Sequence, residues 1–572
     1  ILWTRIHPPA GFAAASIPVR WEIATSPNFA AGTVVDSGLF STTAERDWTV
    51  KVEADGLQSG SRYFYRFQVD GTTSRTGETR TLSSDAESVR LAVFSCANFT
   101  AAEAFDAYGR AAEINRTNPY DAIVHLGDYI YEYGQGGYPQ AEAAAGDRGF
   151  IPAHELITLE DYRLRYQQYH TDRGLVDLRA GAPLIAIWDD HETANDSYRD
   201  GAQNHQSETE GDWATRRDAA LRAYYEWLPI REPERRQGSD AGTPTTPLTQ
   251  GYRSFDFSDV LSLHVLETRL TARDLQLDYA DGPVEQVLAA AYGDPGRHLI
   301  GADQLAWLTQ EMASSTATWQ LLGQQVLMQN MAAPAELLVG AATITQLAAT
   351  NPAAAQSMLV SLLSKYAIPL QKLADGLPLT PEEQALLNSP EKIPYNLDAW
   401  DGYGVERETI LQTAAALGKK LVSLAGDTHN AWAGVLDTFT PNPNTPGTVV
   451  GVELATPGVT SPGLEKYLPG ADAFLRSAFP GIDGLDGLFR AYIPDLAYAD
   501  LNRRGFLDLT VNHGGISAGF ELLSGHDAAT GAPLWSRNSL AVGADLSLSP
   551  VAPSITSVGG ADSRVTAVLG DN

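Results

Sequence analysis

The chain has 572 residues, which is enough for more than one domain and a large hydrophobic core. Its 70 acidic residues outnumber its 40 lysines and arginines, and the formal net charge of −30 argues against a nucleic-acid backbone as a partner. We therefore expect no sequence-specific nucleic-acid binding. No run of about 18 apolar residues occurs, so we expect no transmembrane segment. The single cysteine, Cys96, excludes an intramolecular disulfide.

Residues 1–85 predict an all-β domain. Apolar and polar residues alternate in short segments that are separated by turn signals such as Asp70-Gly71. Their length and spacing are typical of a small immunoglobulin-like β-sandwich. The sequence opens inside a strand-like run, so we expect this domain to be truncated at its start and any export signal to lie upstream. The strand-like segments are residues 1–6, 19–24, 48–52 and 63–69.

Residues 86–525 predict a large domain of the α/β class. Apolar strand-like segments alternate with amphipathic helix-like segments, which is typical of a buried sheet covered by helices. The predicted strands are residues 91–94, 122–126, 183–188, 261–266, 319–327, 420–425, 449–455 and 505–512. The predicted helices include residues 162–169, 213–227 and 304–312.

Two regions depart from this alternation. Residues 332–389 are rich in Ala and Leu and predict an inserted helical subdomain, either a lid or an insertion that only adds stability. Residues 526–572 predict a C-terminal tail, which is loose or forms a final edge strand from about Ser547.

Four of the apolar segments are followed directly by peptides rich in side chains that can bind metals. Open α/β sheets place their binding residues at the carboxyl ends of buried strands, so these peptides are expected to converge. Their thiol, phenol, carboxylate, amide and imidazole groups indicate a site for more than one metal ion. The peptides are Ser95-Cys96-Ala97-Asn98, Gly127-Asp128-Tyr129-Ile130-Tyr131, Asp189-Asp190-His191-Glu192 and Gly426-Asp427-Thr428-His429-Asn430.

Spacing within the peptides predicts which side chains can share a cavity. In an extended segment, residues i and i+2 point to the same side, so Cys96 can face the same cavity as Asn98, and Asp427 the same cavity as His429. Where the chain turns helically, i and i+3 share a face.

Asp128 and Tyr131 have this i, i+3 spacing and can therefore reach one metal ion. A carboxylate has two oxygens, so Asp128 can also bridge two ions with an acidified water between them.

Each motif alone has an ordinary structural explanation. A buried Cys96 could be a small core residue, Asp427 a helix cap, and Asp189-Asp190 a solvated acidic pair. The recurrence of metal-capable groups at all four strand ends favours a metal site.

The motif set resembles the calcineurin-like metallophosphoesterases and, more closely, the PhoD-type alkaline phosphatases. The resemblance rests on Ser-Cys-x-Asn, His-Leu-Gly-Asp-x-x-Tyr, Trp-Asp-Asp-His-Glu and Gly-Asp-x-His, which all stand in this sequence. It spans roughly residues 1–515. It implies a two-sheet metallophosphoesterase sandwich flanked by helices, with the immunoglobulin-like domain at its N-terminal side.

The resemblance also implies a ferric ion beside one or more Ca²⁺ ions, with Zn²⁺ or another divalent ion as the alternative. Thiolate and phenolate suit a ferric ion, and carboxylate and amide oxygens suit Ca²⁺. The implied iron ligands are Cys96, Asp128, Tyr131 and His429. The implied Ca²⁺ ligands are Asp128, Asp190 and Asp427, with Asn98 or Asn195.

The implied activity is hydrolysis of phosphate esters by a metal-activated hydroxide, as an alkaline phosphomonoesterase that also cleaves diesters. His191 is expected either to protonate the leaving oxygen or to orient Asp190. Asn195 and Arg269 are expected to hold phosphate oxygens, although Arg269 could equally form a structural ion pair. Gln325 stands near the place where the superfamily carries a further histidine ligand.

Three other functions stay open at this point. One is a dedicated phosphodiesterase with phospholipase-D-like activity, another is an iron-dependent redox enzyme, and the third is a calcium-binding adhesion module without catalysis. The resemblance implies a periplasmic or secreted protein whose export signal is not in this sequence. The sequence does not define the oligomeric state.

Overall fold

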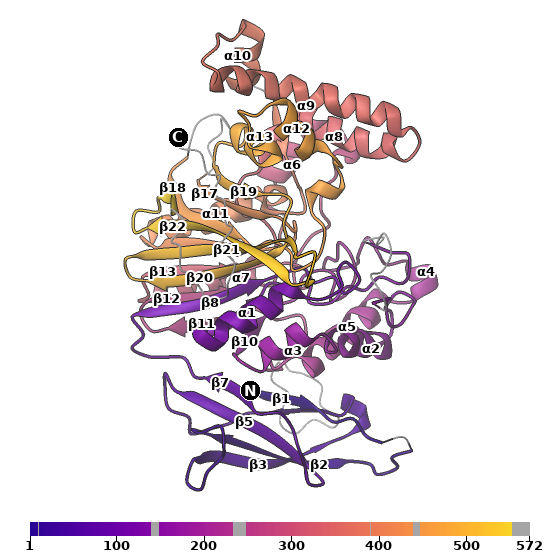
Figure 1. Cartoon of the computed structure of the whole chain (residues 1–572), viewed down its shortest axis with the longest axis vertical. Helices are drawn as coiled ribbons and strands as arrows, with labels where there is room; N and C mark the ends of the chain where they lie inside the picture. The colour runs from indigo at the N-terminus through magenta and orange to yellow at the C-terminus, as the bar shows by residue number, and fades with distance from the viewer. Residues whose placement is uncertain (10, 139–147, 233–246, 389–390, 439–446, 552–572) are drawn as a thin grey trace.

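The computed structural model describes residues 1–551, except for residues 10, 139–147, 233–246, 389–390 and 439–446. Figure 1 shows an N-terminal β-domain at one end, two layers of sheet with flanking helices in the middle, and a helical insertion at the other end.

The N-terminal domain is a small β-sandwich. Its larger sheet has the order β3-β2-β5-β6 with β7 paired to β5, and its smaller sheet pairs β1 with β4. Val19 and Ile23 of β2 pack with Val50, Tyr63 and Phe67 in one buried cluster between the sheets. The strands are β1 (Leu2–Arg5), β2 (Ile17–Ala24), β3 (Val34–Thr42), β4 (Thr49–Val52), β5 (Arg62–Val69), β6 (Thr72–Thr73) and β7 (Gly77–Arg80).

The α/β domain contains two mixed seven-stranded sheets. The first has the order β10-β9-β8-β20-β21-β22-β23, in which β8, β9 and β10 are parallel and the remaining pairs are antiparallel. Its strands are β8 (Ser88–Phe94), β9 (Ala122–His125), β10 (Leu184–Ala186), β20 (Gly505–Asn512), β21 (Gly515–His526), β22 (Pro533–Gly543) and β23 (Leu548–Val551).

The second sheet has the order β11-β12-β13-β16-β18-β17-β19, with a parallel centre from β12 to β18. Its strands are β11 (Arg253–Phe257), β12 (Leu261–Val265), β13 (Trp319–Gly323), β16 (Lys420–Ala425), β17 (Ala431–Asp437), β18 (Val449–Ala455) and β19 (Leu496–Asp500).

The two sheets share one hydrophobic core. Leu91 and Val93 of β8 belong to the same buried cluster as Leu321 of β13 and Val422 of β16. Because successive strand residues point to opposite faces, Leu322 belongs instead to the cluster under the helices that cover the second sheet.

Helices cover the outer faces of both sheets. On the first sheet, Phe94 of β8 packs against Tyr108 of α1 with the ring centroids 5.1 Å apart. Side chains that accept backbone N–H groups fix several helix starts, as Thr158 does for α2 and Asp212 for α5. These helices are α1 (Asp106–Thr117), α2 (Leu159–Tyr169), α3 (Arg173–Arg179), α4 (Ser207–Glu210), α5 (Trp213–Trp227), α6 (Val284–Gly293), α7 (Gly301–Ser314) and α11 (Gly404–Ala416).

The helical insertion lies between two short paired strands, β14 (Ala332–Pro334) and β15 (Lys392–Pro394). It consists of α8 (Ala335–Ala348), α9 (Pro352–Ala374) and α10 (Pro381–Asn388). It packs on α12 (Ala471–Ala478) and α13 (Gly484–Tyr492), where the hydroxyl of Tyr492 donates to the carbonyl of Tyr366. Among the described residues, no helix is both long and apolar enough to cross a membrane.

The expected tail over residues 526–572 is wrong for residues 533–543, which form β22, whereas the expected final edge strand from about Ser547 is present as β23. Strands β22 and β23 add two antiparallel strands to the first sheet. Their pattern is weak because one face is exposed and only Leu540 and Val542 of β22 are buried. The rest of the expected tail, residues 552–572, lies outside the described residues.

Candidate metal centre

The candidate site lies where parallel strands of both sheets end. Cys96 follows β8, Asp128 follows β9, and Asp190 follows β10, all at the carboxyl ends of the first sheet. Asp427 and His429 follow β16 of the second sheet. This is the edge at which open α/β sheets bind ligands, because the loops from neighbouring parallel strands meet there.

The backbone at these positions is held in an unfavourable conformation. Cys96, Asp128, Asp427 and His429 all have left-handed φ values, of 60°, 52°, 59° and 64°. For residues other than glycine, this costs about 1–3 kcal/mol each and is found mainly at functional sites. The surrounding fold therefore holds these four side chains in place against local strain.

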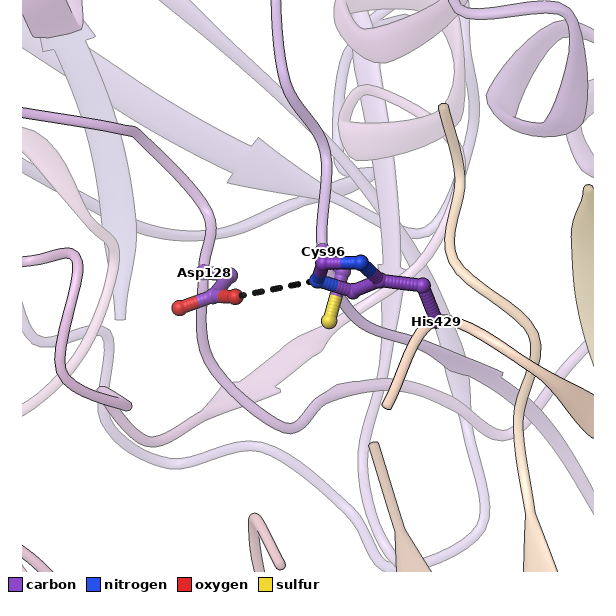
Figure 2. A group of neighbouring side chains, drawn as sticks. All are labelled: Cys96, Asp128 and His429. Atoms are coloured by element: carbon purple, nitrogen blue, oxygen red, sulfur yellow. Dashed lines mark ion pairs between the residues drawn. The ribbon is translucent and has the colours of Figure 1, made fainter. Parts of the chain in front are cut away.

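Three of the predicted iron ligands form a compact group. Ligand atoms of Cys96, Asp128 and His429 all lie within 4.8 Å of one another, and Asp128 Oδ2 is 4.0 Å from His429 Nε2 (Figure 2). His429 Nδ1 is 2.7 Å from the carbonyl oxygen of Pro462, which leaves Nε2 directed at Asp128. Such a bond on the far nitrogen is typical of metal-binding histidines.

The fourth predicted iron ligand, Tyr131, joins this group. Its hydroxyl donates to Asp128 Oδ2 at 2.9 Å and lies 3.3 Å from His429 Nε2. The structure thus brings together all four residues that the family resemblance assigns to iron.

A second group shares Asp128 with the first. Ligand atoms of Asp128, Asp190 and His191 also lie within 4.8 Å of one another. His191 Nδ1 is 2.7 Å from Glu132 Oε2, and its ring stacks on Tyr131 with the centroids 4.2 Å apart. One carboxylate therefore stands between two clusters of donors, as the bridging prediction for Asp128 requires.

Asp427 and Arg269 lie in a neighbouring ion-pair network. The Arg269 guanidinium is fully buried and contacts carboxylate oxygens of Asp189, Asp398 and Asp427, the last at 3.1 Å. Among the described residues, Asp427 belongs to neither close group of ligand atoms. The structural ion pair that the sequence left open for Arg269 is thus the arrangement found here.

The two predicted asparagine ligands have other partners. Asn98 Oδ1 accepts from the backbone N–H and the hydroxyl of Thr100, at 3.0 and 2.9 Å. Asn195 is half-buried, and its Nδ2 donates to Gln203 Oε1 at 3.1 Å. Asn98 Oδ1 is therefore engaged in a turn, whereas Oδ1 of Asn195 has no hydrogen bond to another described residue.

Comparisons with known proteins identify the family. The PhoD-like phosphatase family model matches residues 91–520, and the model of the PhoD-like phosphatase N-terminal domain matches residues 1–83. The chain belongs to the PhoD-like phosphatase family. Alkaline phosphatase D of Bacillus subtilis (strain 168) is 29% identical over 471 residues, which cover 81% of this chain and 67% of that protein. A solved structure of PhoD superposes with a TM-score of 0.70 at 25% identity, covering 97% of this chain and 90% of that one.

These findings confirm two predictions. The resemblance to PhoD-type phosphatases is confirmed, and so is the fold class, a metallophosphoesterase-like α/β core with two mixed sheets and an N-terminal β-sandwich. The chain is a hydrolase homologous to alkaline phosphatase D, and its family implies that it hydrolyses phosphoesters.

The electrostatics of this PhoD-like site fit bound cations. Burial, and after it the neighbouring carboxylates, raises the pKa of the Cys96 thiol and of the Asp427 carboxyl well above their ordinary values. Burial also raises the pKa of Asp128 well above its usual range, although His191 opposes this. Asp128 Oδ1 is buried without a hydrogen-bond partner among the described residues. Buried acids without enough compensating donors are the arrangement that bound metal ions relieve.

Three carboxylates near His191 favour its charged form. Burial disfavours the imidazolium, but Asp190, Glu132 and Asp128 outweigh burial and raise the pKa of His191 well above its ordinary value. For Asp190, burial is outweighed by His191 and Arg269, which lower the pKa of that carboxyl.

Sequence reasoning missed two buried glutamates that hold the loops. Glu132 accepts from His191, from the backbone N–H of Asn195 at 2.7 Å and from Asn204 at 2.9 Å. Its position directly after Tyr131 was the feature of the sequence that could have indicated a role at the site.

Glu192 accepts from the backbone N–H groups of Asp128 at 3.0 Å and of Asp189 at 2.7 Å, and so ties the β9 loop to the β10 loop. The close approach of these loops also requires Gly127, where a Cβ atom would lie 2.3 Å from the backbone nitrogen of Asp189. Glu192 stands within the third motif and could have been found there.

The structure also defines the surroundings of Asp398 and Gln325. Asp398, which contacts Arg269 and Arg273, follows the helical insertion and carries no motif signal. Gln325 is satisfied by Thr268 and by the carbonyl oxygen of Leu266, so it does not replace the missing histidine ligand.

Proposed function

We propose that this chain is a metal-dependent phosphoesterase that hydrolyses phosphomonoesters at alkaline pH and phosphodiesters as well. The observation that carries the proposal is the buried carboxylate of Asp128, which two groups of potential ligands share. The PhoD-like family supports the same chemistry.

In this proposal, Cys96, Asp128, Tyr131 and His429 hold a ferric ion. Asp128 and Asp190 would hold Ca²⁺, with Zn²⁺ or another divalent ion as the alternative, and Asp427 would join them through the carboxylate oxygen that does not contact Arg269. Thiolate, phenolate and imidazole suit Fe³⁺, and an all-carboxylate set suits a hard divalent ion. When bound, such ions neutralise phosphate charge and lower the pKa of a coordinated water.

The reaction consumes one water. Its oxygen forms a bond to phosphorus, the bond between phosphorus and the ester oxygen breaks, and a proton goes to the departing alcohol. His191 is the candidate donor of that proton because Glu132 orients its ring and neighbouring carboxylates favour its charged form. The alternative role, in which His191 only orients Asp190, stays open.

The two predicted phosphate-binding residues differ in whether their side chains are free to bind phosphate. Asn195 is half-buried and remains a candidate to bind a phosphate oxygen. Arg269 is better described as a positioning residue, because its guanidinium is occupied by carboxylates that include Asp427.

The test compares p-nitrophenyl phosphate with bis-p-nitrophenyl phosphate at alkaline pH, before and after chelation. We expect activity on both esters that chelation removes and that Cys96→Ala lacks. The ratio of the two rates distinguishes this proposal from a dedicated phosphodiesterase with phospholipase-D-like activity. Metal-replete protein that cleaves neither ester would contradict the proposal and favour a calcium-binding adhesion module.

We further propose a periplasmic or secreted location, which the family resemblance supports.

A further inference from the structure

A large cavity lies between the N-terminal β-domain and the α/β domain. We call it the interdomain cavity, and its volume is about 1230 Å³. Strands β1, β5 and β7 line it from the N-terminal domain, and α3, β10 and β11 line it from the α/β domain. The two domains meet beside it, where the backbone N–H of Glu78 donates to the carbonyl oxygen of Ala180 at 2.7 Å (Figure 1). Ala122 and Leu184 line it at the amino ends of β9 and β10, so it is separate from the metal centre at their carboxyl ends.

The wall of the interdomain cavity is positively charged although the chain is acidic. Among the described residues that line it, six are arginines and three are acidic, whereas the whole chain has a formal net charge of −30. Four of these arginines form ion pairs with aspartates or glutamates. Arg179 and Arg253 have no carboxylate partner among the described residues, and both donate to backbone carbonyl oxygens instead. An anion in this cavity would therefore meet guanidinium charge that the described part of the chain does not neutralise.

Aromatic rings surround Arg179. Its Cζ lies 5.0 Å from the centroid of the Trp3 ring. The Trp3 ring in turn lies 5.4 Å from the ring of His170 and 5.9 Å from that of Trp227, between centroids. All four residues line the cavity, together with tyrosine and phenylalanine rings of both domains. A planar ring can pack on such a wall edge-on or offset.

Two ring nitrogens of this aromatic group lack partners. His170 Nε2 faces Arg179 Nη1, which can only donate, so Nε2 is the acceptor and Nδ1 carries the proton. Burial, and after it Arg179, lowers the pKa of His170 well below its ordinary value and keeps the imidazole neutral. Nδ1 of His170 and Nε1 of Trp227 are both buried without a hydrogen-bond partner among the described residues. Buried donors without an acceptor are unfavourable, so a ligand that supplies an acceptor would be stabilised here.

Arg179 also connects the interdomain cavity to the metal centre. Its Nη1 donates to the hydroxyl of Tyr129 at 3.3 Å, and the same hydroxyl lies 3.1 Å from His170 Nε2. Tyr129 directly follows Asp128, which both groups of potential metal ligands share. A ligand that recruits Arg179 therefore acts on a residue of the β9 loop.

We propose that the interdomain cavity binds a small aromatic carboxylate, with its carboxylate on Arg179 and its ring on the aromatic wall. The planar guanidinium pairs bidentately with a carboxylate, and one negative charge balances one uncompensated guanidinium. The bound carboxylate competes for the N–H group that the Tyr129 hydroxyl accepts, so its binding lowers kcat at the metal centre. This last consequence rests on the proposed function, whereas the binding itself does not.

The binding test titrates naphthoate into the metal-replete full chain and follows the heat by calorimetry. Naphthamide, the neutral amide of the same ring system, is the matched control ligand. We expect saturable binding of naphthoate with a Kd about tenfold or more below that of naphthamide, because a hydrogen bond to a charged group is stronger than one to a neutral group.

Three variants locate the bound naphthoate. Arg179→Met removes the charge, and Val176→Phe narrows the cavity at α3 without removing a polar side chain. Arg173→Met is the matched control, because Arg173 begins the same helix, has an 86% exposed side chain and does not line the cavity. We expect Kd to rise about tenfold or more in the first two variants and to stay unchanged in the control. If thermal unfolding shows that Arg179→Met does not fold, Val176→Phe decides the outcome.

Tyr129→Phe separates binding from its effect on the metal centre. With p-nitrophenyl phosphate as substrate, we expect naphthoate to lower kcat of the wild type by about fivefold or more without raising KM. Tyr129→Phe should keep the affinity for naphthoate but lose this decrease, because the connecting hydroxyl is gone. Bound naphthoate that leaves the wild-type kcat unchanged would overturn the coupling through Tyr129.

Three further outcomes would overturn the site itself. The wild type could bind no naphthoate or bind naphthamide equally well, or both cavity variants could keep the wild-type Kd. Naphthoate could also raise KM in competition with p-nitrophenyl phosphate and bind Arg179→Met unchanged, which would assign it to the metal centre. In each of these cases the ester is still cleaved, so the proposed function survives. Metal-replete wild type that cleaves no ester would refute the proposed function and the fall in kcat, while calorimetry would still decide whether the cavity binds naphthoate.

Discussion

Glu132 provides a sharp test of how the metal centre is positioned. Its fully buried carboxylate accepts from His191 Nδ1 and the backbone N–H of Asn195, both at 2.7 Å, and from Asn204 at 2.9 Å. In Glu132→Gln, one acceptor oxygen becomes an NH₂ group that faces a donor. A hydrogen bond to a charged group contributes about 1.5–3 kcal/mol. At about 1.36 kcal/mol per tenfold change in rate, we expect kcat/KM to fall by about 10- to 150-fold.

The assay is p-nitrophenyl phosphate hydrolysis with the bound metal quantified in the same samples. Glu160→Gln is the matched control, because Glu160 is exposed on α2 and distant in sequence from the site loops. Thermal unfolding of both variants separates a positioning effect from general instability. If Glu132→Gln and Glu160→Gln had the same kcat/KM, the assignment of Glu132 as the residue that orients His191 would be wrong.

Three further predictions follow from buried charges and from the metal ligands. Arg269→Ala should lower the unfolding free energy by about 3–5 kcal/mol, because it leaves buried carboxylates uncompensated. Denaturant titration measures this change. An unchanged unfolding midpoint would argue against a structural role for Arg269. Burial is the main cause that lowers the pKa of Lys51 from 10.5 to about 8. Between pH 8 and 10.5 the unfolded chain therefore binds more protons than the folded chain. The unfolding free energy should rise with pH over this range, by about 3 kcal/mol in total. Lys51→Met should abolish that rise in pH-dependent denaturant titrations, and a slope that persists would refute it. Cys96→Ser should remove the purple or brown absorption expected of a thiolate- and phenolate-ligated ferric ion, or weaken and shift it, whereas a colourless, iron-free and fully active wild type would contradict the assignment of iron.

The sequence predicted the parallel centre of both sheets well. Strands β16 and β18 of the parallel centre, and the antiparallel strand β20, have the predicted bounds, because strands that are buried on both faces carry continuous apolar runs. The antiparallel strands β11, β17, β21 and β22 were missed. In β22 the reason is plain, since most of its residues are only partly buried and leave little apolar pattern.

For the site, the family resemblance implied the grouping of Cys96, Asp128 and His429, which spacing within each motif did not predict. Cys96 and Asp128 follow adjacent strands of the first sheet, whereas His429 follows β16 of the second sheet. The partner of Asp427 did not follow, because Arg269 comes from a different strand and its third carboxylate, Asp398, lies beyond the helical insertion. Long-range ion pairs of this kind depend on tertiary packing that no local pattern encodes.

In the proposed centre, Asp128 belongs to two metal sites at once. The most direct test is elemental analysis of purified wild type and Asp128→Asn, paired with p-nitrophenyl phosphate hydrolysis on the same samples. We predict at least two ions per wild-type chain, and loss of both bound metal and activity in the variant. Wild-type metal content and activity in Asp128→Asn would contradict it.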